Sequence, residues 1–201
     1  MKTNFSHSNK KSKIIKDYNS SSQYYDKRYH DIQLNKYRLF LEKKWFQEKI
    51  ILDAGCGTGL ILEQVTNFIR FNAFSKCKYV GVDISLNMLK EFQLKLKTLG
   101  KPLIVNLILA DLESLPIREN VADIIFSITV FQNLADIECS LDDLIRVGKA
   151  KFDIIISILK KASDIEKFKS LIRMKLEKYS FENNPCLEDI IVRGTIIKEK
   201  N

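Results

Sequence analysis

The feature that most constrains this chain is the alternation of short apolar runs with amphipathic stretches over residues 50–159. The runs are rich in Ile and Val and lack strict polar alternation, as is typical of strands buried on both faces. They are Ile50–Leu52, Tyr79–Val82, Leu103–Ala110, Ala122–Ile128 and Phe152–Leu159. The stretches between them with helical periodicity are Leu60–Arg70, Leu86–Leu99 and Ile137–Val147. This alternation predicts βαβ units, and so an α/β fold with a doubly wound, mostly parallel sheet and helices on both faces.

The rest of the chain extends the same domain. A last helix is expected where Ile165, Phe168 and Ile172 share one face, and a final strand near Ile190–Ile197. No linker and no second core interrupt the pattern, so we expect one domain over residues 18–201.

The N-terminal residues differ in composition from the rest. Residues 1–17 are polar and basic without apolar periodicity, which predicts a flexible tail. The serines at 20–22 can cap a helix, and apolar residues recur at helical spacing after them, so we expect an N-terminal helix over 18–48. The net charge of +8 permits an anionic partner. RNA is therefore a candidate partner through the tail, and a merely solubilising terminus is the alternative.

A glycine-rich turn follows the first apolar run, in the segment Leu52-Asp53-Ala54-Gly55-Cys56-Gly57-Thr58-Gly59. Glycines there allow a tight turn and let a ligand approach bare backbone. The start of the following helix offers unpaired N–H groups. The spacing is GxGxG, not the GxGxxG of dinucleotide sites, and the acid before it suits a cationic amine better than a pyrophosphate. A glycine turn with only a structural meaning is the alternative.

Acidic residues also end the second and third apolar runs. Asp83 can accept both hydroxyls of a ribose, because a carboxylate accepts several hydrogen bonds. The alternative for Asp83 is a helix cap. Asp111 can accept from an exocyclic amine of a base, with the backbone N–H of Leu112 beside it. We interpret Asp123, at the start of the fourth run, as structural, because ligands bind at the carboxyl ends of such strands.

Together these segments resemble class I S-adenosylmethionine-dependent methyltransferases, within the broad methyltransferase type 11 and quinone-biosynthesis-type group. The segments "LDAGCGTG", "VGVDIS" and "ADLESLPI" carry the resemblance, which covers about Tyr18–Leu159. It implies a sheet order of 3-2-1-4-5-7-6 with an antiparallel last strand, and S-adenosyl-L-methionine as cofactor. The cofactor-binding residues that it implies are Asp53, Ala54, Gly55, Gly57, Gly59, Asp83, Ile84, Asp111, Leu112 and Ile128.

The resemblance extends to the N-terminal helix. Tyr18, Ser22, Tyr25, Asp26 and Tyr29 are similar to a segment that packs over the cofactor as a lid in the family, which implies cofactor contacts for Tyr25 and Tyr29. Aromatic rings attract a sulfonium cation. The alternative is an aromatic stripe that only docks the helix.

The sequence leaves the methyl acceptor open. Many small-molecule members carry histidines where Gln132 and Asn133 stand, no replacement base is evident, and the loop is not of the NPPY type. We therefore assign no catalytic residue. A small-molecule acceptor is the favoured reading. The alternatives are an RNA or protein acceptor and a module that binds the cofactor without catalysis.

Other expectations concern the surroundings of the protein. The four cysteines show no CxxC pair, so we expect neither a disulfide framework nor a metal site, and a cytoplasmic location. No apolar run is long enough to cross a membrane. The run at 103–109 would lie at the sheet edge without charge or proline inside it. Either another part of the chain covers this edge, or a second copy or a partner protein pairs with it.

Overall fold

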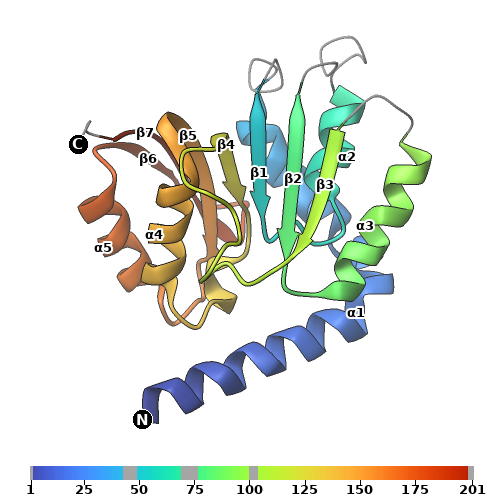
Figure 1. The fold of residues 1–201 in the computed structure, drawn as a ribbon, viewed down its shortest axis with the longest axis horizontal. Helices are drawn as coiled ribbons and strands as arrows, with labels where there is room; N and C mark the ends of the chain where they lie inside the picture. The colour runs from blue at the N-terminus through green and yellow to red at the C-terminus, as the bar shows by residue number, and fades with distance from the viewer. Residues whose placement is uncertain (1, 43–48, 69–76, 100–103, 199–201) are drawn as a thin grey trace.

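The computed structural model describes residues 2–42, 49–68, 77–99 and 104–198 (Figure 1). Its helices are α1 (Lys2–Phe40), α2 (Leu60–Phe68), α3 (Leu86–Thr98), α4 (Ile137–Val147) and α5 (Ile165–Lys175), with a short 3-10 turn, η3 (Phe131–Asn133). Its strands are β1 (Ile50–Ala54), β2 (Lys78–Asp83), β3 (Ile104–Leu109), β4 (Ala122–Ser127), β5 (Gly148–Leu159), β6 (Lys178–Glu182) and β7 (Asp189–Ile197).

The strands form one seven-stranded sheet in the order β3-β2-β1-β4-β5-β7-β6. Strands β1 to β5 are parallel, and β7 runs antiparallel to both β5 and β6. This confirms the predicted fold class, strand order and antiparallel last strand. The order reverses direction at β1, so the carboxyl ends of β1 and β4 open the crevice where doubly wound sheets bind ligands.

Helices cover both faces of this sheet (Figure 1). The end of α1 packs with α2 and α3 on one face, where Phe40 and Phe92 meet Phe126 of the sheet in one apolar cluster. Helices α4 and α5 pack on the other face, where Leu141 and Phe168 belong to a second cluster. The central strands β1 and β4 are buried almost throughout, which explains their uninterrupted apolar runs, whereas the edge strand β3 has no fully buried residue.

Local capping fixes where two of the helices begin. The Ser85 hydroxyl accepts from the backbone N–H of Met88 at the start of α3. The Asp136 carboxylate accepts from the N–H groups of Glu138 and Cys139 at the start of α4. The predicted helix Ile137–Val147 is confirmed with these bounds. Residues 69–70 of the predicted helix Leu60–Arg70, and Leu103 of the predicted strand, lie outside the described residues.

The predicted start of the N-terminal helix was wrong. Helix α1 begins at Lys2, so residues 2–17, interpreted as a flexible tail, are helical. The hydroxyls of Ser20 and Ser21 do not cap a helix start but donate to the carbonyl of Asp17 inside α1. The helix ends at Phe40, and residues 43–48 of the predicted 18–48 helix lie outside the described residues.

The amino-terminal edge of the sheet carries structural contacts. The Asp123 carboxylate accepts from the backbone N–H of Ile50 at 2.9 Å and from Lys149 Nζ at 2.8 Å. These bonds tie β1 and β5 to β4, which confirms the structural interpretation of Asp123. Within the described residues, no helix is both long and apolar enough to span a membrane.

Candidate functional site

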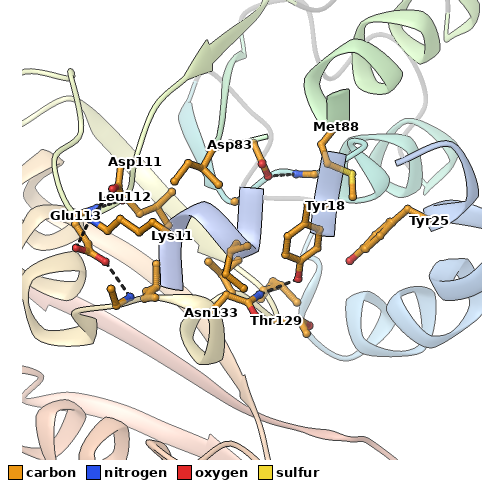
Figure 2. A pocket seen from close by; sticks show the side chains of 18 residues that line it. Lys11, Tyr18, Tyr25, Asp83, Met88, Asp111, Leu112, Glu113, Thr129 and Asn133 are labelled. Atoms are coloured by element: carbon orange, nitrogen blue, oxygen red, sulfur yellow. Dashed lines mark hydrogen bonds and ion pairs between the residues drawn. The ribbon is translucent and has the colours of Figure 1, made fainter. Parts of the chain in front are cut away.

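A cavity lies at the carboxyl ends of β1 to β4, and α1 crosses its mouth (Figures 1 and 2). We call it the strand-end cavity. It is lined by Lys11, Ile14, Tyr18 and Tyr25 from α1, by Gly55 and Gly57 after β1, by Asp83, Ile84 and Met88 at and after the end of β2, by Asp111, Leu112 and Glu113 after β3, and by Ile128, Thr129, Val130, Asn133, Leu134 and Ala135 after β4.

The glycine turn after β1 forms the floor of this cavity. The N–H groups of Gly55 and Cys56 both donate to the carbonyl of Val82, which closes the turn against β2. Gly57 has a φ of +53°, a region that favours glycine, and a Cβ added there would meet nothing within 4 Å. Gly57 therefore leaves open space above bare backbone, which is what a ligand seated on the turn requires.

Asp83 stands beside this turn at the end of β2. One carboxylate oxygen accepts from the N–H of Gly57 (Figure 2) and the other from the N–H of Ser85, each at 2.8 Å. Burial raises the pKa of Asp83, and the backbone hydrogen bonds oppose that rise. A carboxylate offers about four lone-pair sites, so Asp83 keeps acceptor capacity for a pair of ligand hydroxyls.

The far wall of the cavity is charged. Lys11 Nζ lies 2.7 Å from Asp111 Oδ2 and 2.5 Å from Glu113 Oε2, and so joins α1 to the loop after β3 (Figure 2). The backbone N–H of Glu113 also donates to Asp111 Oδ1 at 3.0 Å. Asp111 therefore meets an amine of this same chain at the place where a ligand amine was expected.

Two tyrosine rings from α1, Tyr18 and Tyr25, also line the cavity. Asn133 Nδ2 donates to the hydroxyl of Tyr18 at 2.8 Å (Figure 2). The ring of Tyr25 lies 6.3 Å from that of Tyr18 and 4.8 Å from that of Tyr29. Burial raises the pKa values of Tyr18 and Tyr25, so both phenols are neutral near pH 7. Their rings are suited to a ligand cation.

Four of the predicted cofactor residues do not line the strand-end cavity. Ala54 is fully buried within β1, and Tyr29 faces a neighbouring groove. Gly59 has a φ of +80°, and a Cβ there would lie 2.2 Å from the ring of Phe92. Glycine is therefore required at this position for packing. Asp53 lies below the turn, where it accepts a hydrogen bond from the hydroxyl of Tyr79.

Burial governs the charge of Asp53. It raises the pKa of this carboxyl to about 7, although the Tyr79 hydrogen bond favours the charged form. Asp53 is therefore only partly ionised at neutral pH, which weakens its suitability as a standing negative charge for a ligand amine.

The other predicted residues do line the cavity, and several lining residues were missed. Tyr25, Gly55, Gly57, Asp83, Ile84, Asp111, Leu112 and Ile128 were predicted. Lys11 and Ile14 were missed because residues 1–17 were interpreted as a tail. Lys11, Ile14, Tyr18 and Tyr25 follow one another at intervals of three, four and seven residues, which places them on one helix face. This spacing could have revealed Lys11 and Ile14.

A second, larger cavity adjoins the first along α1, and we call it the lateral groove. Its volume is about 660 Å³, against about 80 Å³ for the strand-end cavity. It is lined by one flank of α1 from Ile14 to Lys36, by Thr129, Gln132 and Asn133 after β4, by Leu159 and Lys161 at and after the end of β5, and by Glu188 before β7. Both cavities share Ile14, Tyr18, Tyr25, Thr129 and Asn133.

A buried polar cluster lies where the two cavities meet. Lys36 Nζ lies 2.8 Å from Asp189 Oδ1, and both side chains are almost fully buried. The Thr129 hydroxyl donates to Asp189 Oδ2 and accepts from Lys36 Nζ, each at 2.8 Å. Thr129 has a φ of +60°, which is rare for a β-branched residue. The cluster thus holds α1, β7 and the loop after β4 together around a strained residue.

Within the described residues, no group of three or more His, Cys, Asp or Glu side chains could hold a metal ion. The site instead offers bare backbone, a carboxylate with free acceptor capacity and neutral aromatic rings. These groups fit a ligand that has a ribose, an adenine and a sulfonium centre.

Comparison with known proteins agrees with this geometry. A family model described as "Methyltransferase domain" matches residues 52–159, more than half of the chain. No curated protein matches this chain at a significant level.

Solved structures share the fold at low sequence identity. Magnesium protoporphyrin IX methyltransferase from Synechocystis, solved with bound S-adenosylmethionine, is 15% identical with a TM-score of 0.69, over 92% of this chain and 96% of that one. A methyltransferase from Aquifex aeolicus is 19% identical with a TM-score of 0.64, over 93% and 98%.

A third structure is a complex with the Haloferax volcanii Trm112 methyltransferase activator. Its methyltransferase is 10% identical to this chain, with a TM-score of 0.65 over 90% of this chain and 97% of that one. With the family match, the sheet order and the cavity at the strand ends, this chain belongs to the class I S-adenosylmethionine-dependent methyltransferases.

Proposed function

We propose that the protein transfers the methyl group of S-adenosylmethionine to a small-molecule acceptor that binds in the lateral groove. The observation that carries this proposal is the shared wall of Tyr18, Tyr25, Thr129 and Asn133 between the two cavities. A ligand in the groove therefore lies beside a ligand in the strand-end cavity. A volume of about 660 Å³ is within the range of about 300–1,000 Å³ that small-molecule sites occupy.

The roles of the chain's own residues follow from their contacts. Gly55 and Gly57 would hold the amino-acid end of the cofactor, Asp83 its ribose, and Ile84, Asp111 and Leu112 its adenine. Bound there, the cofactor supplies a methyl group activated by a positively charged sulfur. The protein orients the two reactants and excludes water, which is the main contribution available without a strong base.

Cofactor binding requires the N-terminal half of α1 to shift. The strand-end cavity holds only about 80 Å³, and Lys11, Ile14 and Tyr18 of α1 form part of its wall. Since typical sites are several times larger, this half of α1 would move outward on binding. The ion pairs of Lys11 with Asp111 and Glu113 are the contacts that must loosen.

An RNA acceptor is less favoured by the contacts of α1. Lys11 is paired with two carboxylates, and Lys10 Nζ donates to the carbonyl of Leu134 at 2.5 Å. These two lysines are thus used within the chain, whereas Lys13 and Lys16 of the same helix are exposed. We propose that the protein is located in the cytoplasm, because the four free cysteines of the chain suit a reducing compartment.

The edge strand β3 is a candidate surface for a second copy or a partner protein. Among the described residues it pairs only with β2, and Ile104 and Leu109 are 55% and 54% exposed. Sedimentation of wild type and Ile104→Lys would test this surface, with Met174→Lys on α5, 66% exposed, as control. Only Ile104→Lys should dissociate an assembly, and a wild type that stays monomeric would exclude self-association through β3.

Incubation with methyl-labelled cofactor and fractionated cell extract tests the proposed function. Label in the small-molecule fraction is the expected result. Label in RNA or protein would show that the acceptor is a macromolecule of that class and not a small molecule. Tight cofactor binding without label in any fraction would indicate a binding module without catalysis.

A further inference from the structure

One buried amide in the lateral groove has a side-chain oxygen without a hydrogen-bond partner, although the same side chain hydrogen-bonds to Tyr25. Gln33 lines the groove from α1 and is only 4% exposed. Its Nε2 lies 3.4 Å from the hydroxyl oxygen of Thr129. Its Oε1 is buried without any partner. An unsatisfied buried carbonyl is costly, so it calls for an explanation.

The neighbouring cluster fixes which way this amide points. The single proton of the Thr129 hydroxyl goes to Asp189 Oδ2, and Lys36 is a donor only. The Thr129 oxygen can therefore only accept a hydrogen bond from Gln33, which requires the amide nitrogen to face it. Gln33 Oε1 must then point away from the cluster and keep its lone pairs free.

The charges around the groove balance. Asp17 and Glu188 stand on its rim together with Arg28 and Lys161, while Lys36 is neutralised by Asp189. Because positive and negative side chains on the rim are equal in number, the groove favours a ligand without net charge. Gln33 itself is neutral and cannot take up a proton, so a nucleophile bound to it must be reactive without losing its proton first.

Aromatic rings line the same stretch of α1. Tyr25 and Tyr29 lie 4.8 Å apart, and Tyr24 on the rim is 68% exposed. The exposed ring of Tyr24 can stack with another aromatic group, and the half-buried rings of Tyr25 and Tyr29 extend the same surface. A surface for ring stacking and one buried acceptor atom together suit a flat aromatic ligand with one N–H or O–H donor.

We propose, on the basis of the methyltransferase function proposed above, that the lateral groove binds an uncharged aromatic amine whose N–H donates to Gln33 Oε1. This hydrogen bond uses an N–H of the amine and leaves the nitrogen lone pair free to react. The nitrogen forms a bond to the methyl carbon while the sulfur–carbon bond breaks, and its electron pair stays on sulfur as a neutral thioether. The nitrogen, now positive, then releases its proton to water.

Three probes of equal shape test the hydrogen bond. Aminoquinoline, hydroxyquinoline and methylquinoline, each substituted at the same carbon, are titrated into protein saturated with S-adenosylhomocysteine. Wild type should bind the amino and hydroxyl probes roughly 5- to 150-fold more tightly than the methyl probe, the range for satisfying one buried acceptor. With methyl-labelled S-adenosylmethionine, only the amino probe should take up label.

Two variants separate recognition from folding. Gln33→Met keeps the shape of the side chain and removes its polar atoms, so it should abolish the preference over methylquinoline. Its thermal midpoint should change little, because the lost carbonyl had no partner and the lost contact of Nε2 with Thr129 is long, at 3.4 Å. Ser21→Ala, on the same groove wall with a hydroxyl that bonds only its own helix, should keep the preference.

The outcomes distinguish this inference from the proposed function. Equal affinity for all three probes, no binding of any, a preference that survives Gln33→Met, or label on hydroxyquinoline alone would each overturn the inference while leaving the proposed function in place. A lower thermal midpoint for Gln33→Met together with an unchanged preference would make Gln33 purely structural. Failure of wild type to bind S-adenosylhomocysteine would overturn the proposed function itself.

Discussion

The strand-end cavity and the lateral groove share a wall but are built in different ways. The cavity is formed mainly by the main chain at the ends of consecutive strands, where the N–H of Gly57 donates directly to Asp83. The groove is assembled from side chains of α1, the loop after β4 and the start of β7, which meet only in the folded chain. Short local motifs therefore reveal the first site, whereas the second depends on tertiary packing.

The largest effect is expected at the junction of the two sites. Lys36→Met would leave the buried carboxylate of Asp189 without its cation and should lower the free energy of unfolding by ~3–5 kcal/mol. Chemical denaturation measures this loss. Lys169→Met, which removes a solvent-exposed pair with Glu166, should leave the free energy of unfolding almost unchanged. A similar small cost at Lys36 would show that the cluster does not hold the groove together.

Asp53 offers a pH test below the glycine turn. Its pKa is raised from 3.8 to about 7 in the folded state, so its contribution to stability is fully present below about pH 4 and is lost as the pH rises toward 7. Asp53→Asn removes this titration. Relative to wild type, the variant should therefore gain stability between about pH 4 and pH 7. A constant difference in denaturation free energy over that range would contradict the raised pKa.

The next variant distinguishes cofactor binding in the strand-end cavity from ligand binding in the lateral groove. Asp83→Ala should weaken binding of S-adenosylhomocysteine by roughly 10- to 150-fold, the cost of ~1.5–3 kcal/mol for charge-assisted hydrogen bonds. Binding of the quinoline probes to the groove should change far less. Calorimetry on both ligands makes the comparison. Unchanged cofactor affinity in a folded variant would exclude Asp83 as the ribose ligand.

The smallest effect concerns the α1 contacts over the cavity. Lys11→Met removes partly exposed ion pairs that must loosen on binding, so it should tighten S-adenosylhomocysteine by no more than about 5-fold, or ~1 kcal/mol. Lys13→Met, on the exposed side of the same helix, is the matched control. Weaker binding by the Lys11 variant would mean that Lys11 supports the bound state instead.

Particular residues show what the sequence could predict. The bounds of α4 followed from apolar periodicity, which is a local signal, whereas the strand order followed only from the resemblance to a methyltransferase family. The Gly55, Gly57 and Asp83 part of the cavity followed from motif spacing. The start of α1 did not, because its first half is polar and is held by contacts such as the Ser85 hydroxyl with Asn19 Oδ1 at 2.7 Å.

The groove shows the limit more sharply. Nothing in the local sequence of Gln33, Lys36 or Asp189 marks these residues as partners, since they lie on α1 and β7, at opposite ends of the chain. Thr129 joins them only because the turn after β4 brings it between them. Such pairs are set by packing of the whole sheet and cannot be derived from periodicity or motif spacing.

The most direct test of the central claim is a calorimetric titration of S-adenosylhomocysteine into wild type and Gly57→Val side by side. We expect one ligand per wild-type chain and no detectable binding to the variant. Valine would force a β-branched residue to a φ of +53° and fill the open space above the turn. Equal binding by a folded Gly57→Val protein, or no binding by wild type, would contradict a cofactor seated on this turn.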